Sequence, residues 1–132
     1  MTYTDVMLDL ETVGTAPGSG IIAIGAVAFA AGMPENEWLQ LRMPPISRAA
    51  CRRAGLTEDA DTLTWWMSQA AEAKSVFDTA TNDESHCWGL YSALITFKES
   101  FCPQDICVWG NGADFDNVLL QCAYKAVGMT PG

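Results

Sequence analysis

The sequence has few of the residues that build zinc sites and disulfide frameworks. It contains a single histidine, and its five cysteines form an odd number with no C-x-x-C pair. A structural zinc ion needs four clustered Cys or His ligands, so the composition indicates neither a zinc site nor a disulfide framework. Free cysteine commonly behaves as a small buried hydrophobe. We therefore expect structural thiols in a reducing compartment.

Basic residues are also scarce. Seven Lys and Arg stand against 16 Asp and Glu, which gives a net charge of -9. Affinity for phosphates normally comes from clustered cations, and only Arg42, Arg48, Arg52 and Arg53 approach a cluster. The last three are the candidate phosphate contacts, although a solvated helix face is the simpler interpretation. An acidic chain can still bind phosphates through divalent cations held by its own carboxylates.

Long apolar runs are absent. The longest, residues 21–31, is interrupted by Gly25 and lacks the basic flank of a signal peptide. We therefore expect no membrane partner and a cytoplasmic location. A chain of 132 residues, 49% of them hydrophobic, is long enough for one core, so we expect a single domain over residues 1–132.

The hydrophobic pattern predicts an α/β domain. Three strands are expected first, joined as an antiparallel meander by short Gly- and Pro-containing turns. Residues 44–60 carry turn and short helical signals, and two helices, a short buried strand and a final helix follow. Gly128 is a natural C-cap for the last helix. The predicted order is βββααβα, with strands at residues 4–10, 21–30, 37–43 and 106–109 and helices near 65–77, 83–100 and 115–126.

Two carboxylates stand at the end of the first predicted strand. Asp9 and Glu11 are two residues apart, so both project from one strand face, whereas Val6, Leu8 and Leu10 occupy the other. Two like charges side by side repel, and without a cation one of them would have a raised pKa or turn to solvent. A solvated strand face is the alternative interpretation.

A second carboxylate site lies in "VWGNGADFDNVLL". Asp114 suits the N-cap of the last helix, and Asp116 falls in its first turn. If strand 106–109 runs parallel to the first strand, this turn emerges at the same sheet edge as Glu11, where ligands bind in α/β sheets. Three carboxylates of this kind suit Mg²⁺ or Mn²⁺. A dinucleotide fingerprint fails because its third glycine would fall at Phe115, and a hairpin fails because a helical pattern follows.

These motifs resemble those of the DnaQ-like 3'-5' exonucleases. That family has D-x-E-T on its first strand, here Asp9 to Thr12, and an F-D pair that opens a helix, here Phe115 and Asp116. The stretches "DTLTWWMSQAAEAK" and "VWGNGADFDNVLL" resemble the subgroup of the mycobacterial-type exoribonuclease and exodeoxyribonuclease VIII-like domains, found in bacteria and phages. The resemblance implies an RNase H-like α/β fold, a mixed sheet with flanking helices, in a bacterial or phage-infected cell.

The resemblance also implies an activity. Asp9, Glu11 and Asp116 would hold two Mg²⁺ or Mn²⁺ ions for hydrolysis of phosphodiester bonds at the 3' end of single-stranded RNA or DNA. Asp9 would bridge both ions, with Glu11 on one and Asp116 on the other. Thr12 and the backbone around Val13 would line the pocket of the 3'-terminal nucleotide.

Further substrate contacts are expected from aromatic and amide side chains. Trp65 and Trp66 point about 100° apart on a helix, so one belongs to the core and the other is free to stack on a base. We take Trp66, Gln69 one turn later and Asn111 as the substrate-binding candidates. No residue is identifiable as a reader of the 2'-hydroxyl, so RNA and DNA both stay open.

The sequence departs from the family at its end. The family's third motif, H-x-x-x-x-D, supplies the general base and a fourth metal ligand, and the sequence stops at Gly132 before it. His86 is not expected to replace it, because the residue five positions on is Tyr91. We expect the last strand and helix to be missing and the activity to be impaired. The alternative is an inactive remnant that binds a nucleotide or a partner protein.

The missing strand would leave residues 106–109 as an exposed sheet edge. Such an edge presents unpaired backbone groups to other chains. We therefore hypothesise either self-association, as a homodimer, or a truncated product of a longer reading frame.

Overall fold

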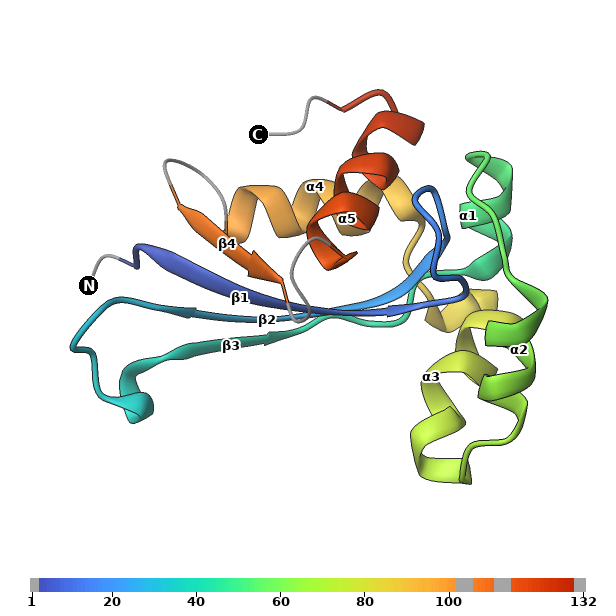
Figure 1. Cartoon of the computed structure of the whole chain (residues 1–132), viewed down its shortest axis with the longest axis horizontal. Coiled ribbons are helices and arrows are strands. Elements are labelled where there is room, and N and C mark those ends of the chain that lie inside the picture. Colours follow the sequence, from blue (N-terminus) through green and yellow to red (C-terminus); the bar gives the residue numbers. More distant parts are fainter. Residues whose placement is uncertain (1–2, 102–105, 111–114, 130–132) are drawn as a thin grey trace.

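A four-stranded mixed sheet forms the centre of the fold. The computed structural model describes residues 3–101, 106–110 and 115–129. The strand order is β3-β2-β1-β4, with β2 antiparallel to both β1 and β3 and with β4 parallel to β1 (Figure 1). This confirms the predicted meander and meets the condition that the strand near residues 106–109 runs parallel to the first strand. The strands are β1 (Asp5–Thr12), β2 (Ile21–Phe29), β3 (Leu39–Arg42) and β4 (Cys107–Gly110).

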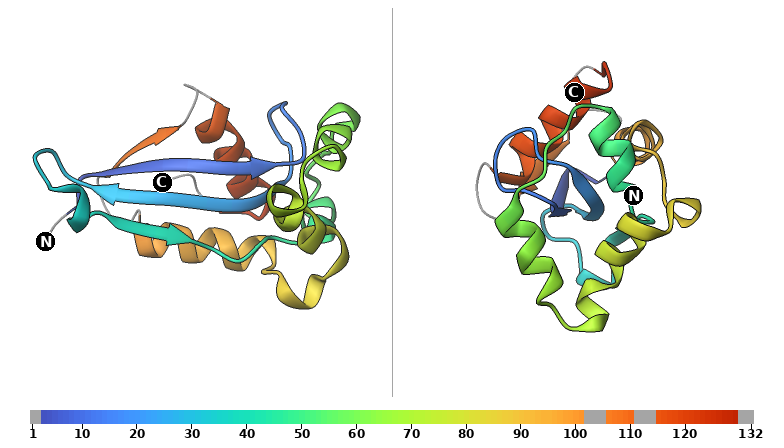
Figure 2. Two further views of the ribbon diagram at one scale, coloured as in Figure 1. Left: turned by 90° about the horizontal axis from the view of Figure 1, so that it is seen from below. Right: turned by 90° about the vertical axis from the view of Figure 1, so that its right-hand side faces the viewer.

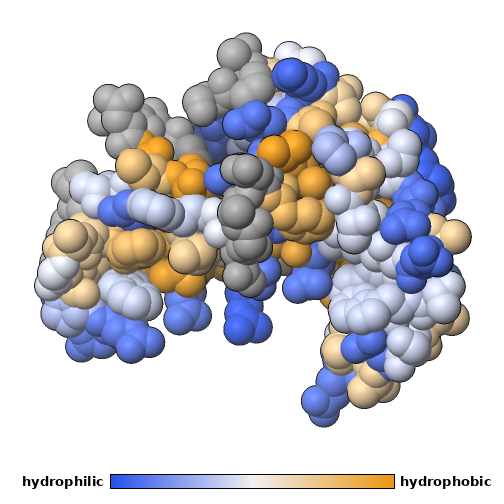
Figure 3. All heavy atoms as spheres, in the orientation of Figure 1, coloured by the Kyte–Doolittle hydropathy of each residue, from blue (hydrophilic) through white to orange (hydrophobic). Residues whose placement is uncertain are grey.

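The helices cover one face and one end of the sheet. Helices α4 and α5 lie behind the sheet in the left view of Figure 2, whereas α2 and α3 lie at its right-hand end. Helices α1 to α3 gather at the end where β1 stops, and Figure 3 shows mostly hydrophilic residues there and apolar residues around α5. No helix among the described residues is long and apolar enough to span a membrane. The helices are α1 (Arg48–Arg53), α2 (Ala60–Met67), α3 (Ala71–Asn82), α4 (Leu90–Phe101) and α5 (Phe115–Ala126), with 3-10 turns η1 (Glu35–Glu37) and η2 (Glu84–His86).

The alternation along β1 separates the core from an open face. Val6, Leu8 and Leu10 are buried, as predicted, and join a cluster with residues of α4 and α5. Met7 and Asp9 project from the opposite face and are exposed. Since α4 and α5 cover only the buried face, the second face of the sheet is available for a ligand.

A second, smaller cluster connects the end of β1 to α2 and α3. It contains Val13, Trp66 and Phe77, all at most 3% exposed. The ring of Trp66 stacks on Phe77, with centroids 5.6 Å apart, and its Nε1 donates a hydrogen bond of 2.8 Å to the carbonyl of Thr12. This packing fixes the chain just beyond the D-x-E-T motif.

The helix predicted over residues 65–77 is wrong, because two helices occupy this region. Helix α2 starts at Ala60 behind the N-cap Asp59, ends at Met67, and α3 begins at Ala71. In one continuous helix, the 11 residues from Trp66 to Phe77 would span roughly 16 Å, too far for stacked rings. The break folds α3 back so that the rings meet. Residues 83–100 likewise divide into η2 and α4.

Other predicted elements agree with the structure. The short helical signals before residue 60 correspond to α1, and the last helix is α5, as predicted. Gly128 follows α5 with φ of 77°, the left-handed conformation expected of a glycine C-cap. β4 pairs only with β1 among the described residues, so it forms the expected sheet edge. Pairing of this edge with a second copy stays a prediction. Sedimentation velocity of the purified chain, which measures its oligomeric state, tests it.

The cysteines divide into one buried thiol and several more accessible ones. Cys51 is 1% exposed, donates from Sγ to the carbonyl of Ile21, and burial raises its pKa to about 11. This confirms a structural thiol at Cys51. Cys107 is exposed, Cys87 and Cys122 are half-buried, and none of these four forms a disulfide. Cys102 lies outside the described residues.

An arginine connects α1 to α3 through the segment before α2. Arg48 bonds to both carboxylate oxygens of Glu58, at 2.7 and 2.8 Å, and donates to Thr81 at 2.9 Å. Its guanidinium also lies 4.9 Å from the ring centroid of Phe77. Arg52 contributes a further bond of 3.1 Å to Glu58. Arg48 is therefore a structural residue, not an accessible phosphate contact.

We expect Arg48→Met to lower the free energy of unfolding by about 1 to 3 kcal/mol at pH 7, because a largely buried Glu58 loses its main partner. The hydrogen bond from Arg48 is the first cause of the lowered pKa of Glu58. A lowered carboxylate pKa stabilises the fold above the ordinary value of 4.5, and this contribution is lost as the pH falls through the lowered value. Urea unfolding at pH 7 and pH 3 measures both effects.

The control for this prediction is Arg53→Met. Arg53 pairs with Glu84, and both side chains are more than half exposed. Exposed ion pairs contribute little, so this variant should unfold close to the wild type. Equal losses in the two variants at pH 7 would contradict the structural role of Arg48.

Candidate active site

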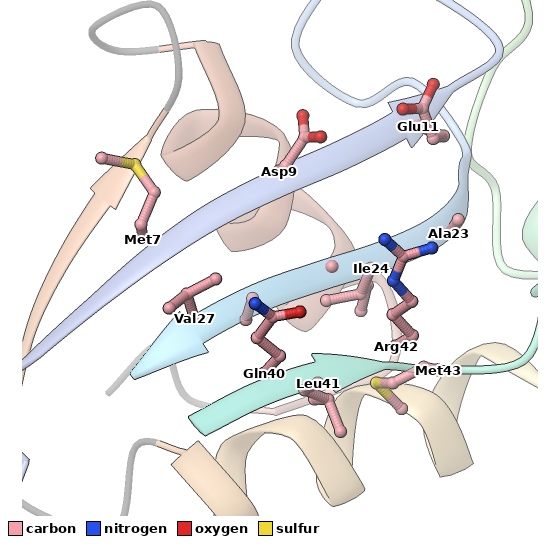
Figure 4. A pocket seen from close by; sticks show the side chains of 12 residues that line it. Met7, Asp9, Glu11, Ala23, Ile24, Val27, Gln40, Leu41, Arg42 and Met43 are labelled. Carbon is pink, nitrogen blue, oxygen red and sulfur yellow. The ribbon is translucent and has the colours of Figure 1, made fainter. Parts of the chain in front are cut away.

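Asp9 and Glu11 border a groove on the open face of the sheet. Across β2, Asp9 faces Gly25 and Glu11 faces Ala23. Figure 4 shows both carboxylates projecting from β1 on the same side. The groove has a volume of about 430 Å³. Its lining comes from β1, β2 and β3 and from the residue after β3: Met7, Asp9, Glu11, Ala23, Ile24, Gly25, Ala26, Val27, Gln40, Leu41, Arg42 and Met43.

Asp116 lies at the same edge of the sheet. It is in the first turn of α5 and only 2% exposed. Because β4 is parallel to β1 and its last residue lies opposite Leu8, the chain leaves β4 in the direction of Asp9 and Glu11. Asn117 anchors this turn, since its Nδ2 donates a hydrogen bond of 3.2 Å to the carbonyl of Val108.

The charges of both motifs act on Glu11. Partial burial raises the pKa of Glu11, and the negative charges of Asp9 and then Asp116 raise it further. Like charges near a partly buried carboxyl group disfavour its ionised form. The first and second motifs therefore lie within electrostatic reach of each other.

The donor set suits a hard divalent cation. Carboxylate oxygens are the ligands that Mg²⁺ and Mn²⁺ prefer, and a bound cation would relieve the repulsion felt by Glu11. The side chains do not yet form one coordination shell, because no three His, Cys, Asp or Glu side chains in the described part of the chain are arranged to hold a metal. Metal binding by these residues stays a proposal.

The segment after Glu11 differs from expectation. Val13 is fully buried, its N–H donates to the carbonyl of Gly20, and its own carbonyl accepts from Asp59 N–H. Its N–H is therefore already bonded within the fold, so the expectation that the backbone here contacts the terminal nucleotide needs correction. Thr12 is half-buried, and its hydroxyl donates to the carbonyl of Gly14 at 2.8 Å.

The expectation for Trp66 also needs correction. Its ring is 3% exposed and packed on Phe77, so it has no free face for a base. Trp65 is the accessible member of the pair, at 52% exposed, with its ring edge against Trp66. Gln69 donates from Nε2 to the carbonyl of Trp65 at 3.1 Å, which closes the end of α2. None of these three side chains lines the groove.

Two further candidate residues, Asn111 and Asp114, lie outside the described residues. His86 is mostly exposed in η2, where its Nδ1 lies 2.7 Å from Asp83, and it does not line the groove. This agrees with the expectation that His86 does not act as the base.

Gln40 lines the groove but was not predicted as a site residue. Alternation within the predicted third strand places it on the same face as Arg42.

Comparison with known families decides the classification. The model of the family described as 3'-5' exoribonuclease Rv2179c-like domain matches residues 4–132. The chain belongs to this family. Membership confirms the resemblance to the DnaQ-like 3'-5' exonucleases. A search of curated proteins found no match.

Solved structures show the same fold. Escherichia coli Exonuclease I in complex with a dA16 oligonucleotide is similar with a TM-score of 0.66 and 13% identity, over 98% of this chain and 25% of that chain. The same enzyme with a 5cy-dA13 oligonucleotide gives 0.66 and 14% over the same shares. The chain thus spans about a quarter of the length of these structures, and the likeness confirms the α/β exonuclease fold.

We expect Glu11→Gln to raise the melting temperature at pH 7 in the absence of metal, by about 2 °C. A raised folded-state pKa means that the contribution of Glu11 to stability is present below its ordinary value of 4.5 and is lost as the pH rises through the raised value. At pH 7 the wild type therefore carries the repulsion that the amide removes. Thermal unfolding followed by circular dichroism measures the difference.

At pH 3.5 the glutamate is largely protonated in both states, and the two proteins should melt together. The matched control is Glu37→Gln, which removes the same charge from an exposed residue of η1. A melting temperature of Glu11→Gln that stays at or below that of the control at pH 7 would mean that Glu11 is not under strain.

Proposed function

We propose that this domain is a divalent-metal-dependent 3'-5' exonuclease that hydrolyses phosphodiester bonds at the 3' end of single-stranded nucleic acid. The observation that carries the proposal is the parallel pairing of β4 with β1, which brings two motifs more than a hundred residues apart to the same sheet. The negative charges of Asp9 and Asp116 both raise the pKa of Glu11, which agrees with this placement. Membership in the exoribonuclease-domain family supports it. The oligonucleotides in the two similar Exonuclease I structures agree with a single-stranded substrate.

Each residue has a distinct part in this proposal. Asp9, on the exposed strand face, would contact two Mg²⁺ or Mn²⁺ ions, with Glu11 and the buried Asp116 each contacting one. When bound, such ions activate a water molecule and stabilise the leaving oxygen. Trp66 acts as a positioning residue, because its bond to the Thr12 carbonyl fixes the strand end beside Glu11.

Turnover by the 132-residue chain is proposed to be slow. General bases in such sites are most often histidines. The sequence has one histidine, and it pairs with Asp83 outside the groove. The same observation favours a second candidate function, binding of nucleic acid without hydrolysis at the same groove.

The test is incubation of the purified chain with 5'-labelled single-stranded RNA and DNA in Mn²⁺ or Mg²⁺. We expect a ladder that shortens from the 3' end and disappears in EDTA. Asp9→Asn and Asp116→Asn should each lower the rate by about 100-fold or more, because each removes a charged metal ligand. Glu37→Gln removes a remote charge and should leave the rate unchanged.

The assay separates the two candidate functions. Full cleavage by Asp9→Asn, or cleavage that persists in EDTA, would contradict the metal-dependent mechanism. Metal-dependent binding of the oligonucleotide with no ladder would favour the binding function. Isothermal titration with Mn²⁺ supplies a readout without substrate, and the heat of binding should be lost in Asp9→Asn.

A further inference from the structure

Three of the four arginines are paired with carboxylates, and the fourth has no such partner among the described residues. Arg48 and Arg52 share Glu58, and Arg53 bonds to a second glutamate. Arg42, the last residue of β3, is exposed, and no carboxylate oxygen among the described residues lies within 4.0 Å of its nitrogens. A chain with a net charge of -9 offers an arginine many acidic partners. The position of Arg42 apart from them is therefore unexpected.

Arg42 lies across the groove from the carboxylates. Gly25 pairs with Asp9 on one side and with Arg42 on the other, so these three residues form one row on the open face. Adjacent strands are about 4.8 Å apart, which places the Cα atoms of Asp9 and Arg42 about 10 Å apart. Gly25 has no side chain, so the floor between them is low. Figure 4 shows the guanidinium and both carboxylates projecting from this face.

The row behind Arg42 adds a second polar group on the same side. Gln40 pairs with Val27, which pairs with Met7, and all three side chains line the groove. The groove thus has two unlike walls. The β1 wall carries the carboxylates, and the β3 wall, Gln40 and Arg42, carries a guanidinium and an amide.

We propose that the β3 wall binds the phosphodiester backbone of the single-stranded nucleic acid. The inference rests on the proposed function and deepens it by placing the substrate over Gly25. Guanidinium is a planar donor that matches phosphate oxygens in two parallel hydrogen bonds. The volume of about 430 Å³ lies within the range of ligand sites.

The two walls are expected to act together. Without a divalent ion, the carboxylates of Asp9 and Glu11 repel a phosphate, and the attraction of Arg42 is largely cancelled. With both proposed ions bound, their four positive charges would exceed the three negative charges of Asp9, Glu11 and Asp116, and the groove would become complementary to a polyanion. The β3 wall would also contact RNA and DNA alike, since phosphate contacts carry no information about the sugar.

The test uses fluorescence anisotropy with 5'-labelled single-stranded RNA and DNA of one sequence, in Mg²⁺, over a range of KCl concentrations. Phosphorothioate linkages at the 3' end prevent cleavage during the measurement. We expect Arg42→Met to raise Kd about tenfold for both oligonucleotides and to lower the slope of log K against log salt by about 0.7, the value for one phosphate contact on a single strand. Arg53→Met removes the same charge outside the groove and should leave the slope unchanged.

A second variant adds a side chain to the floor of the groove, at Gly25, without changing any charge. A Cβ at Gly25 would approach only the backbone oxygen of Asp9, at an ordinary contact distance of 3.5 Å, so the fold accommodates it. Alanine also loses less backbone entropy than glycine when the strand forms. We expect Gly25→Ala to raise Kd several-fold while its melting temperature stays at or above that of the wild type.

The outcomes separate this inference from the function on which it rests. If the wild type binds and cleaves but Arg42→Met keeps its Kd and salt slope, the β3 wall is not a phosphate site and the exonuclease proposal stands. If Arg42→Met instead only tightens Mg²⁺ binding, Arg42 merely balances the carboxylates and the inference is also overturned. If the wild type neither binds nor cleaves any oligonucleotide, both proposals fail.

Discussion

The parallel pairing of β4 with β1 is the constraint on which the site depends. Leu8 pairs with Gly110, so the chain leaves β4 at the edge where β1 delivers Glu11, and α5 can place Asp116 there. A slip of one residue would exchange the two faces of β4. Two contacts oppose that slip: Val108 packs against the core, and Trp109, on the open face, donates from Nε1 to Asp5 at 2.9 Å. The register of a four-residue strand therefore decides whether the carboxylates meet.

The arrangement of β1 that suits the proposed function also places like charges side by side, which lowers stability. Leu8 and Leu10 are buried beneath the sheet, and this fixes the intervening Asp9 and the following Glu11 on the open face, whatever their mutual repulsion. A more flexible strand would relieve the repulsion by moving the half-buried Glu11 away from Asp9. The Trp66 bond at Thr12 removes that freedom at the strand end. Hydrophobic packing thus holds like charges together where a cation can later neutralise them.

Periodicity alone was enough to predict the strands, the faces of β1 and the terminal helix, because each depends on residues within one segment. The break between α2 and α3 depends on Phe77 meeting Trp66, and no glycine or proline marks it. The same contact decides which tryptophan is buried, so a choice between Trp65 and Trp66 was not available from local pattern. Arg42 was missed for a related reason, since the register of β3 on β2 sets its neighbours.

Net charge is a poor guide to where an acidic protein can meet a polyanion. Glu58 and Glu84 lie near 3 Å from the three arginines of α1 and offset two of their three positive charges, which weakens the field outside. What counts is a cation that has no carboxylate partner among the described residues and that lies on the same face as carboxylates suited to divalent ions. The groove on β1 to β3 combines both features within three strands. If the two proposed ions bind, a chain with a net charge of -9 would present a locally positive surface at this groove.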